Sequence, residues 1–182
     1  MSAEARTSLS DPLQIAAVEL PDGGAIGITL CPGKQQAQAL NGAWARDLDT
    51  DLRAIRAWGA ELLVSLLEDH ELAELGVAGL PAAAAAAGLE FHRLPVPDGE
   101  PPGKEFEFHW LDLGPELQRR LRAGGRVVIH CKGGLGRAGT VAARLLIELG
   151  EPPWSAVNRV REARPGAIET AAQEHYLMFL RS

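Results

Sequence analysis

The sequence predicts a single α/β domain with a central, mainly parallel sheet flanked by helices. Short apolar segments typical of buried strands alternate with segments of helical periodicity, which is the order that parallel sheets require. The length of 182 residues suits one domain with a substantial core, and no internal repeat or long linker divides it. We therefore expect residues 12–182 to form one domain, preceded by a polar, disordered lead-in over residues 1–11.

The first part of the domain is expected to contain a hairpin and a helix. Strands at residues 14–20 and 25–30 flank a Pro-Asp-Gly-Gly turn sequence, so they should pair as neighbours. A helix is expected over residues 49–58, where apolar residues recur at helical spacing and Gly59 supplies a stop.

The middle of the chain continues the alternation of strands and helices. A compact apolar run predicts a buried strand at residues 62–67, followed by a short helix at 70–75. A proline and a run of alanines predict the helix over residues 81–87, and a strand at 89–94 follows it. Residues 95–103 contain four prolines and are expected to form a loop.

The last part is expected to hold one strand among helices. Pro115 suits the first position of a helix over residues 115–123, where its missing N–H is not needed. The strand at 127–130 precedes three more helices, at residues 138–149, 154–163 and 169–180.

The bulk composition limits the classes of function. A net charge of −6 gives little electrostatic support for a nucleic-acid partner, so none is expected, although it leaves room for a local basic pocket. The polar start lacks the apolar core of a signal peptide, and no apolar run is long enough to span a membrane, so no membrane role is expected.

Two cysteines, Cys31 and Cys131, are too few for a disulfide framework and favour a reducing, cytoplasmic location. Histidines other than His130 lack the spacing of metal ligands, so neither a metal nor another cofactor is expected.

The most informative segment joins the strand at 127–130 to the helix that follows. Its residues are, in order, His130, Cys131, Lys132, Gly133, Gly134, Leu135, Gly136 and Arg137. Backbone N–H groups from 132 to 137 can converge on an anion at the helix N-terminus, and Arg137 can add two parallel hydrogen bonds to it. The same groups favour the thiolate form of Cys131. The segment therefore predicts attack of Cys131 on a phosphate ester held by the loop.

Other interpretations of this glycine-rich loop are weaker. The pattern G-x-G-x-x-G at residues 134–139 matches a dinucleotide fingerprint, but that motif needs a further strand ending in an acidic residue, and here only helices follow. A Walker loop needs a lysine, whereas Thr140 follows Gly139 directly. Cys131 could also be a small buried residue in a tight turn, but the conjunction with Arg137 argues against that.

A phosphate ester also needs a proton donor for its leaving group, and arginine cannot supply one. Asp98 is the first candidate, in the proline-rich loop after a predicted strand, with Glu100 second and Asp112 third. Pro-Asp-Gly is also an ordinary turn sequence, so the pattern alone leaves Asp98 open. His130 is expected either to brace the loop through backbone carbonyls or to be an ordinary core histidine.

Residues 130–137 resemble the His-Cys-x-x-x-x-x-Arg signature of protein tyrosine and dual-specificity phosphatases. Residues 66–72, 95–99 and 166–170 are similar to segments of the kinase-associated phosphatase subgroup. The resemblance implies the fold of these cysteine phosphatases, a phosphocysteine intermediate and Asp98 as the general acid. It also implies a phosphoprotein or phosphopeptide substrate, and a kinase as a partner.

The sequence departs from this family's pattern at two positions. Ala138 stands where the family usually has a serine or threonine, whose hydroxyl eases departure of the thiolate. Glu169, a supporting residue beside the site, stands where the family has glutamine. Both bear on breakdown of the phosphocysteine, so slow turnover is expected. A phosphate-binding module with little turnover is therefore the alternative. A rhodanese-like sulfur carrier is a third interpretation, which Arg137 and the upstream acid argue against.

Overall fold

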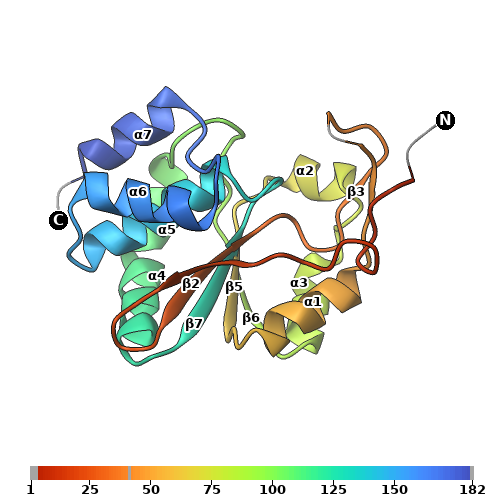
Figure 1. The fold of residues 1–182 in the computed structure, drawn as a ribbon, viewed down its shortest axis with the longest axis horizontal. Coiled ribbons are helices and arrows are strands. Elements are labelled where there is room, and N and C mark those ends of the chain that lie inside the picture. The colour runs from red at the N-terminus through yellow and green to blue at the C-terminus, as the bar shows by residue number, and fades with distance from the viewer. Residues whose placement is uncertain (1–3, 41, 181–182) are drawn as a thin grey trace.

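The computed structural model of the protein describes residues 4–40 and 42–180. A five-stranded sheet in the order β1-β2-β7-β5-β6 forms its centre (Figure 1). The strands are β1 (Ala16–Glu19), β2 (Ala25–Thr29), β5 (Leu62–Ser65), β6 (Glu90–Arg93) and β7 (Arg126–His130). β1 is antiparallel to β2, and all other neighbours are parallel, which confirms the predicted mainly parallel sheet.

Helices cover both faces of the sheet, as the sequence predicted. Figure 1 shows one group on each side. The first group is α1 (Leu48–Ala57), α2 (Asp69–Glu74) and α3 (Leu80–Ala86), and the second is α4 (Lys104–Arg122), α5 (Gly136–Glu148), α6 (Pro153–Ala163) and α7 (Ala171–Met178). Within the described residues, no helix is both long and apolar enough to cross a membrane.

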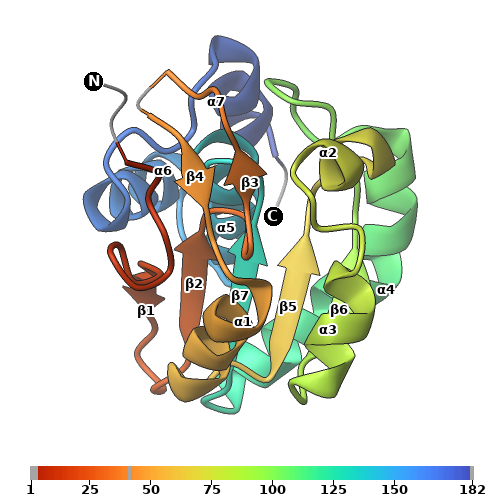
Figure 2. The same ribbon diagram turned by 90° about the vertical axis from the view of Figure 1, so that its right-hand side faces the viewer.

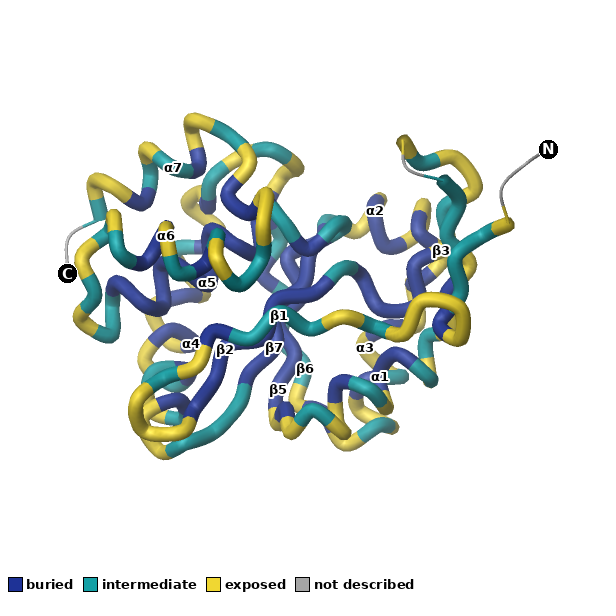
Figure 3. The backbone as a smooth tube through the Cα atoms, in the orientation of Figure 1, coloured by how far each residue is buried: buried dark blue, intermediate teal, exposed yellow. Residues whose placement is uncertain are grey.

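The core is deepest around β7 and α5. β7 lies between β2 and β5, and its run Val127, Val128 and Ile129 is fully buried, as expected for a central parallel strand. All residues of α5 from Gly136 to Ile147 are buried as well (Figure 3). The connection between β7 and α5 therefore emerges from the most rigidly packed part of the molecule.

The predicted start of the helix at residues 115–123 is wrong. α4 begins at Lys104, and Pro115 lies inside it rather than at its first position. Pro115 cannot donate to the carbonyl of Leu111, but Leu111 is exposed, so water can satisfy that carbonyl. The buried face of α4 runs through Phe106, Trp110 and Leu117 at helical spacing, and its burial outweighs the missing hydrogen bond.

The predicted disordered lead-in also differs from the structure. Residues 1–3 lie outside the described residues, but residues 4–11 pack against a two-stranded ribbon that the sequence did not predict, β3 (Gln35–Gln36) and β4 (Trp44–Ala45). The N–H of Arg6 donates to the carbonyl of Ala43 (2.9 Å), and the N–H of Ala45 donates to that of Arg6 (2.9 Å). Figure 2 shows this ribbon beyond the carboxyl ends of β2 and β7.

Asp51, a residue of α1, binds both the ribbon and the N-terminal segment through its side chain. Its carboxylate is only 1% exposed and is paired with Arg46, whose Nε lies 2.9 Å from Oδ2. The same carboxylate accepts hydrogen bonds from the hydroxyl of Ser8 (2.8 Å) and the N–H of Gly33 (2.9 Å). Three chain segments thus converge on one buried charge, which explains why the polar lead-in is held in place.

Replacement of Asp51 by alanine is expected to destabilise the protein by about 3–5 kcal/mol, because it leaves the buried guanidinium of Arg46 unpaired. Asp49→Ala is the matched control, since Asp49 lies in the same helical turn but is exposed, and it should cost less than about 0.5 kcal/mol. Urea unfolding of both variants measures the difference. Equal stability of the two variants would contradict this role of Asp51.

Candidate active site

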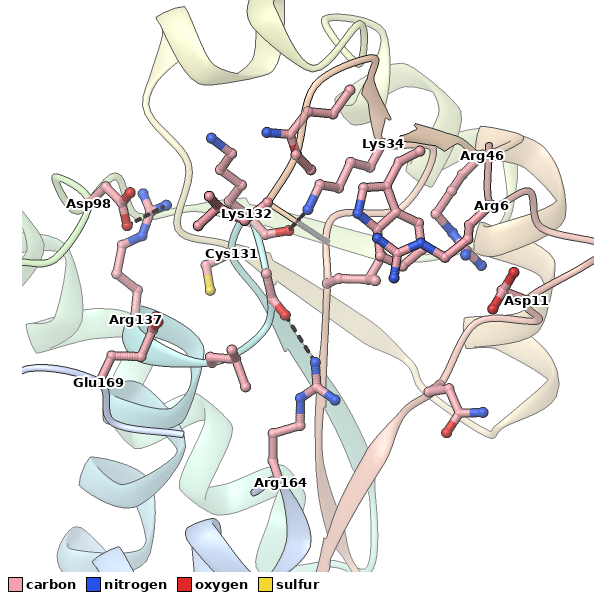
Figure 4. Close-up of a pocket in the computed structure, with 18 of the residues that line it drawn as sticks. Arg6, Asp11, Lys34, Arg46, Asp98, Cys131, Lys132, Arg137, Arg164 and Glu169 are labelled. Carbon is pink, nitrogen blue, oxygen red and sulfur yellow. Dashed lines mark hydrogen bonds and ion pairs between the residues drawn. The ribbon is translucent and has the colours of Figure 1, made fainter. Parts of the chain in front are cut away.

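Cys131 lies directly after the carboxyl end of β7, where the chain turns into α5. This edge of a parallel sheet is where ligands bind in open α/β folds. The side chain of Cys131 is 3% exposed and belongs to the lining of a cavity of about 990 Å³. The thiol is therefore at the floor of a site that opens to solvent, as Figure 4 shows.

The loop after Cys131 has a shape that glycine makes possible. Gly134 has a φ of +70°, and a Cβ there would lie 2.5 Å from the carbonyl carbon of Thr29, at the end of β2. The carbonyls of Gly133 and Gly134 accept hydrogen bonds from the guanidinium of Arg164, at 3.0 and 3.1 Å. These carbonyls are thus held on the side of Arg164, and the loop can direct N–H groups towards the cavity.

Arg137 is buried and held in a fixed orientation. Its Nη1 and Nη2 each donate to one oxygen of Glu71, both at 2.8 Å, and Nη1 also donates to the carbonyl of Val96 at 2.9 Å. Burial opposes ionisation of Glu71, but the hydrogen bonds from Arg137 and from its own helix turn hold the pKa of Glu71 below its ordinary value. The ionised pair fixes the guanidinium beside the loop.

Glu71 is a site residue that the sequence analysis missed as such. It lies in the segment 66–72 that resembles the phosphatase subgroup, but a carboxylate near the start of a short helix has an ordinary local explanation. The signal that could have identified it is the need of a buried arginine for a carboxylate partner.

Asp98 lies at the mouth of the cavity. Its side chain is 70% exposed, and its Oδ1 lies 3.4 Å from Nη2 of Arg137. The hydroxyl of Thr170 donates to the carbonyl of Gly99 (3.0 Å) and ties this loop to the start of α7. The other two predicted candidates lie elsewhere, because neither Glu100 nor Asp112 lines the cavity around Cys131.

His130 is fully buried beneath the loop. Its Nδ1 donates to the carbonyl of Cys131 at 2.9 Å, which fits the bracing contact that the sequence predicted. Burial lowers the pKa of His130 to about 4, against the smaller opposite effect of this hydrogen bond. The ring is therefore neutral at pH 7 and adds no positive charge beside the thiol.

Glu169 contacts the loop after Cys131 directly. Its Oε1 accepts a hydrogen bond from the N–H of Gly136 at 2.9 Å. One of the backbone N–H groups predicted to bind phosphate is therefore already bonded to a carboxylate. Ile168 before it has a φ of 60°, which is unusual for a β-branched residue, and the N–H of Glu169 donates to Oε1 of Gln173 (3.0 Å). The surrounding contacts thus hold Glu169 at the N-terminus of α5.

The structure places no free hydroxyl at the two positions, Ala138 and Thr140, that follow Arg137 in the helix. Ala138 is fully buried and offers no hydroxyl. The hydroxyl of Thr140 donates to the carbonyl of Gly136 at 2.7 Å, one helical turn back, so it is directed into the helix.

The second cysteine, Cys31, lies near Cys131 but does not line the cavity, and its N–H donates to the carbonyl of Lys132 at 3.2 Å. Cys31 is buried, and burial raises the pKa of its thiol to about 12.

In the described part of the chain, one group has ligand atoms close enough to hold a metal, namely Glu68, His70 and Glu71. Both oxygens of Glu71 already accept hydrogen bonds from Arg137, so this group offers no free set of ligands.

The fold and the site define the class of protein. A cysteine at the end of the central strand, a glycine-rich loop and a buried arginine at the following helix characterise the protein tyrosine and dual-specificity phosphatases. Residues 38–177 match a family model described as PTP-SAK, Swiss Army Knife protein, DSP-PTPase phosphatase domain. The chain belongs to this family.

Comparisons with individual proteins agree. The chain is 32% identical over 135 residues to cyclin-dependent kinase inhibitor 3 of Rattus norvegicus, a match that covers 72% of this chain and 62% of that protein, less than two thirds of its length. The crystal structure of a kinase-associated phosphatase whose catalytic-site cysteine is replaced by serine has a TM-score of 0.80 and 27% identity, and the match covers 91% of this chain and 92% of that one. Tk-PTP in its active form has a TM-score of 0.63 and 28% identity, covering 89% and 93%. The predicted resemblance to the kinase-associated subgroup is thus confirmed.

Proposed function

We propose that the protein is a phosphoprotein phosphatase that acts through a phosphocysteine at Cys131. The observation that carries the proposal is the common cavity of Cys131, Arg137 and Asp98, with Arg137 fixed by Glu71. The family, and the kinase-associated phosphatase of similar fold, support a phosphorylated protein as the substrate, and a kinase among its partners. The two free cysteines are consistent with a reducing, cytoplasmic location.

The first chemical step transfers the phosphoryl group to sulfur. The loop amides and Arg137 bind the phosphate oxygens, and the thiolate of Cys131 forms a bond to phosphorus as the ester P–O bond breaks. Asp98 gives its proton to the oxygen that leaves. The loop amides and Arg137 form no covalent bond to phosphate. They contribute by positioning the phosphoryl group and by stabilising the charge on its oxygens.

The second step returns the enzyme to its starting state. Water attacks phosphorus while Asp98, now ionised, accepts a proton, and the P–S bond breaks with sulfur leaving as thiolate. Ala138 gives this leaving thiolate no hydroxyl donor, and the hydroxyl of Thr140 is committed to a backbone carbonyl. This observation favours slow breakdown and also supports the alternative function, a phosphate-binding module with little turnover.

Cys131→Ser is expected to abolish release of phosphate from p-nitrophenyl phosphate, because an alcohol at this position is a far weaker nucleophile than a thiolate. Cys31→Ser is the matched control and should retain activity, since Cys31 lies outside the cavity. Phosphate release by the Cys131→Ser variant would refute the phosphocysteine mechanism. A wild-type protein that binds phosphopeptide without releasing phosphate would instead establish the binding module.

Asp98→Asn is expected to lower kcat by about 10²-fold or more for phenyl phosphate, whose leaving group needs a proton. The loss should be much smaller for p-nitrophenyl phosphate, whose leaving group departs readily as an anion. Glu100→Gln changes an acid of the same loop that does not line the cavity, and should affect neither substrate. An equal loss for both substrates in Asp98→Asn would show that Asp98 is not the proton donor.

Ala138→Ser is expected to speed breakdown of the phosphocysteine roughly tenfold, since a charge-assisted hydrogen bond would stabilise the departing thiolate. Rapid-quench measurements should show less phosphoenzyme at steady state and a higher turnover rate. Thr140→Val removes the neighbouring hydroxyl with little change in volume and should leave the breakdown rate unchanged. An unchanged rate in Ala138→Ser would show that the missing hydroxyl at residue 138 does not limit breakdown of the phosphocysteine.

A further inference from the structure

The cavity that contains Cys131 extends well beyond the phosphate-binding loop, and its charge is opposite to that of the chain. Three carboxylates line it, at Asp11, Asp98 and Glu169. Six basic side chains line it as well, at Arg6, Lys34, Arg46, Lys132, Arg137 and Arg164. The whole chain has a net charge of −6, so positive charge is concentrated at this one place.

Three of these cations already have structural partners. Arg137 is paired with Glu71, Arg46 is paired with Asp51, and Arg164 donates to loop carbonyls. Across residues 4–40 and 42–180, no carboxylate lies within 4 Å of the charged groups of Arg6, Lys34 or Lys132. These three side chains and Arg164 therefore carry positive charge that no carboxylate in the described residues compensates, and of the four only Arg164 is held by the carbonyls of the loop after Cys131 through two hydrogen bonds.

Lys34 is the most unusual of them, because it is only 6% exposed. Its ammonium group has three N–H donors, and its one hydrogen bond within the described chain goes to the carbonyl of Lys132 at 3.3 Å. That carbonyl belongs to the residue directly after Cys131, so Lys34 reaches the edge of the phosphate loop. Burial also lowers its pKa, which an anion bound beside it would reverse.

Arg6 lies on the same side of the cavity, over the ring of Trp44. Its Cζ is 3.5 Å from the ring centroid, and Nζ of Lys34 is 5.3 Å from it. The Nη2 of Arg6 donates to the carbonyl of Gly42 at 3.3 Å, whereas its buried Nε has no hydrogen-bond partner within the described residues. Asp11 also lines the cavity, and its Oδ2 accepts a hydrogen bond from the hydroxyl of Ser10. Figure 4 shows Arg6 and Lys34 together on the side of Cys131 opposite Asp98.

We propose that Lys34, Arg6 and Trp44 form a second anion subsite, which binds a second phosphate on the same substrate molecule. This inference rests on the proposed phosphatase function. A guanidinium fork and an ammonium are the groups that bind phosphate best, and stacking on Trp44 limits the freedom of Arg6 in advance. Because the subsite and Cys131 line one cavity, a single ligand can present a phosphate to each of them.

The remaining lining favours a phosphoprotein segment as the ligand. Gln14, Gln36 and Gln38 border the same cavity. Their amides offer both donors and acceptors, which match the N–H and carbonyl groups of an extended peptide. The preferred substrate is therefore a protein segment with two phosphorylated side chains, one cleaved at Cys131 and the other held by Lys34 and Arg6.

The test compares kcat/KM for a doubly phosphorylated peptide with that for its two singly phosphorylated forms. The wild-type protein should prefer the doubly phosphorylated peptide by about tenfold or more, since charge-assisted hydrogen bonds are added. Lys34→Met and Arg6→Gln should each reduce this ratio several-fold. The ratio cancels any effect of Lys34 on the loop through Lys132. Arg53→Gln removes an exposed positive charge outside the cavity and should leave the ratio unchanged.

A preference that is absent, or that survives in both variants, would overturn the subsite. A Lys34-dependent preference for an inositol bisphosphate over the monophosphate, without one for the peptide, would overturn the phosphoprotein ligand. If the wild-type protein releases no phosphate from any compound, the proposed function fails. The subsite is then tested by calorimetry on the Cys131→Ser variant. This variant should bind the doubly phosphorylated peptide more tightly than either singly phosphorylated peptide. Equal affinities for the three peptides would refute the subsite.

Discussion

The pairing of Arg137 with Glu71 is the interaction on which the site depends. The two residues belong to helices that follow β7 and β5, which are adjacent parallel strands, so the starts of both helices lie at the same edge of the sheet. A buried guanidinium without this carboxylate would be an uncompensated charge in the core. Buried ion pairs of this kind seldom add net stability over apolar side chains, so the benefit of this pair is the fixed position of a positive charge beside Cys131.

The sheet determines what else can reach that charge. Because β7 is central, the loop after it is enclosed by segments that follow β2 and β5, and Gly134 packs directly on the end of β2. The ribbon of β3 and β4 extends this enclosure, and the buried carboxylate of Asp51 holds it against α1. The loop after Cys131 and the basic side of the cavity are thus held by one connected set of contacts, although their residues are distant in the sequence.

Sequence reasoning succeeded where the signal is local and failed where it is tertiary. The segment from His130 to Arg137 predicted the strand-to-helix turn that the structure contains, and the chemistry assigned to its glycines, thiol and guanidinium stays a prediction. Glu71 and Lys34 carry no such signal, since each looks like an ordinary surface charge until the fold buries it. Pro115 misled the prediction of α4 because a local rule for proline was outweighed by the burial of an apolar helix face. The ordered lead-in depends on a contact with Asp51, more than forty residues away.

In the proposed mechanism, the site favours capture of an anion over its release. Arg137, the loop and the basic side of the cavity would all attract phosphate, whereas Ala138 offers no hydroxyl donor to help the thiolate depart. Glu169 acts in the opposite direction, because its carboxylate shares the N–H of Gly136 with any phosphate that enters and repels that phosphate. A neutral glutamine could keep the same hydrogen bond without the repulsion. In the proposed mechanism, the negative charge at residue 169 therefore offsets part of the affinity for phosphate, and it would assist product release where the thiolate must leave without a hydroxyl donor.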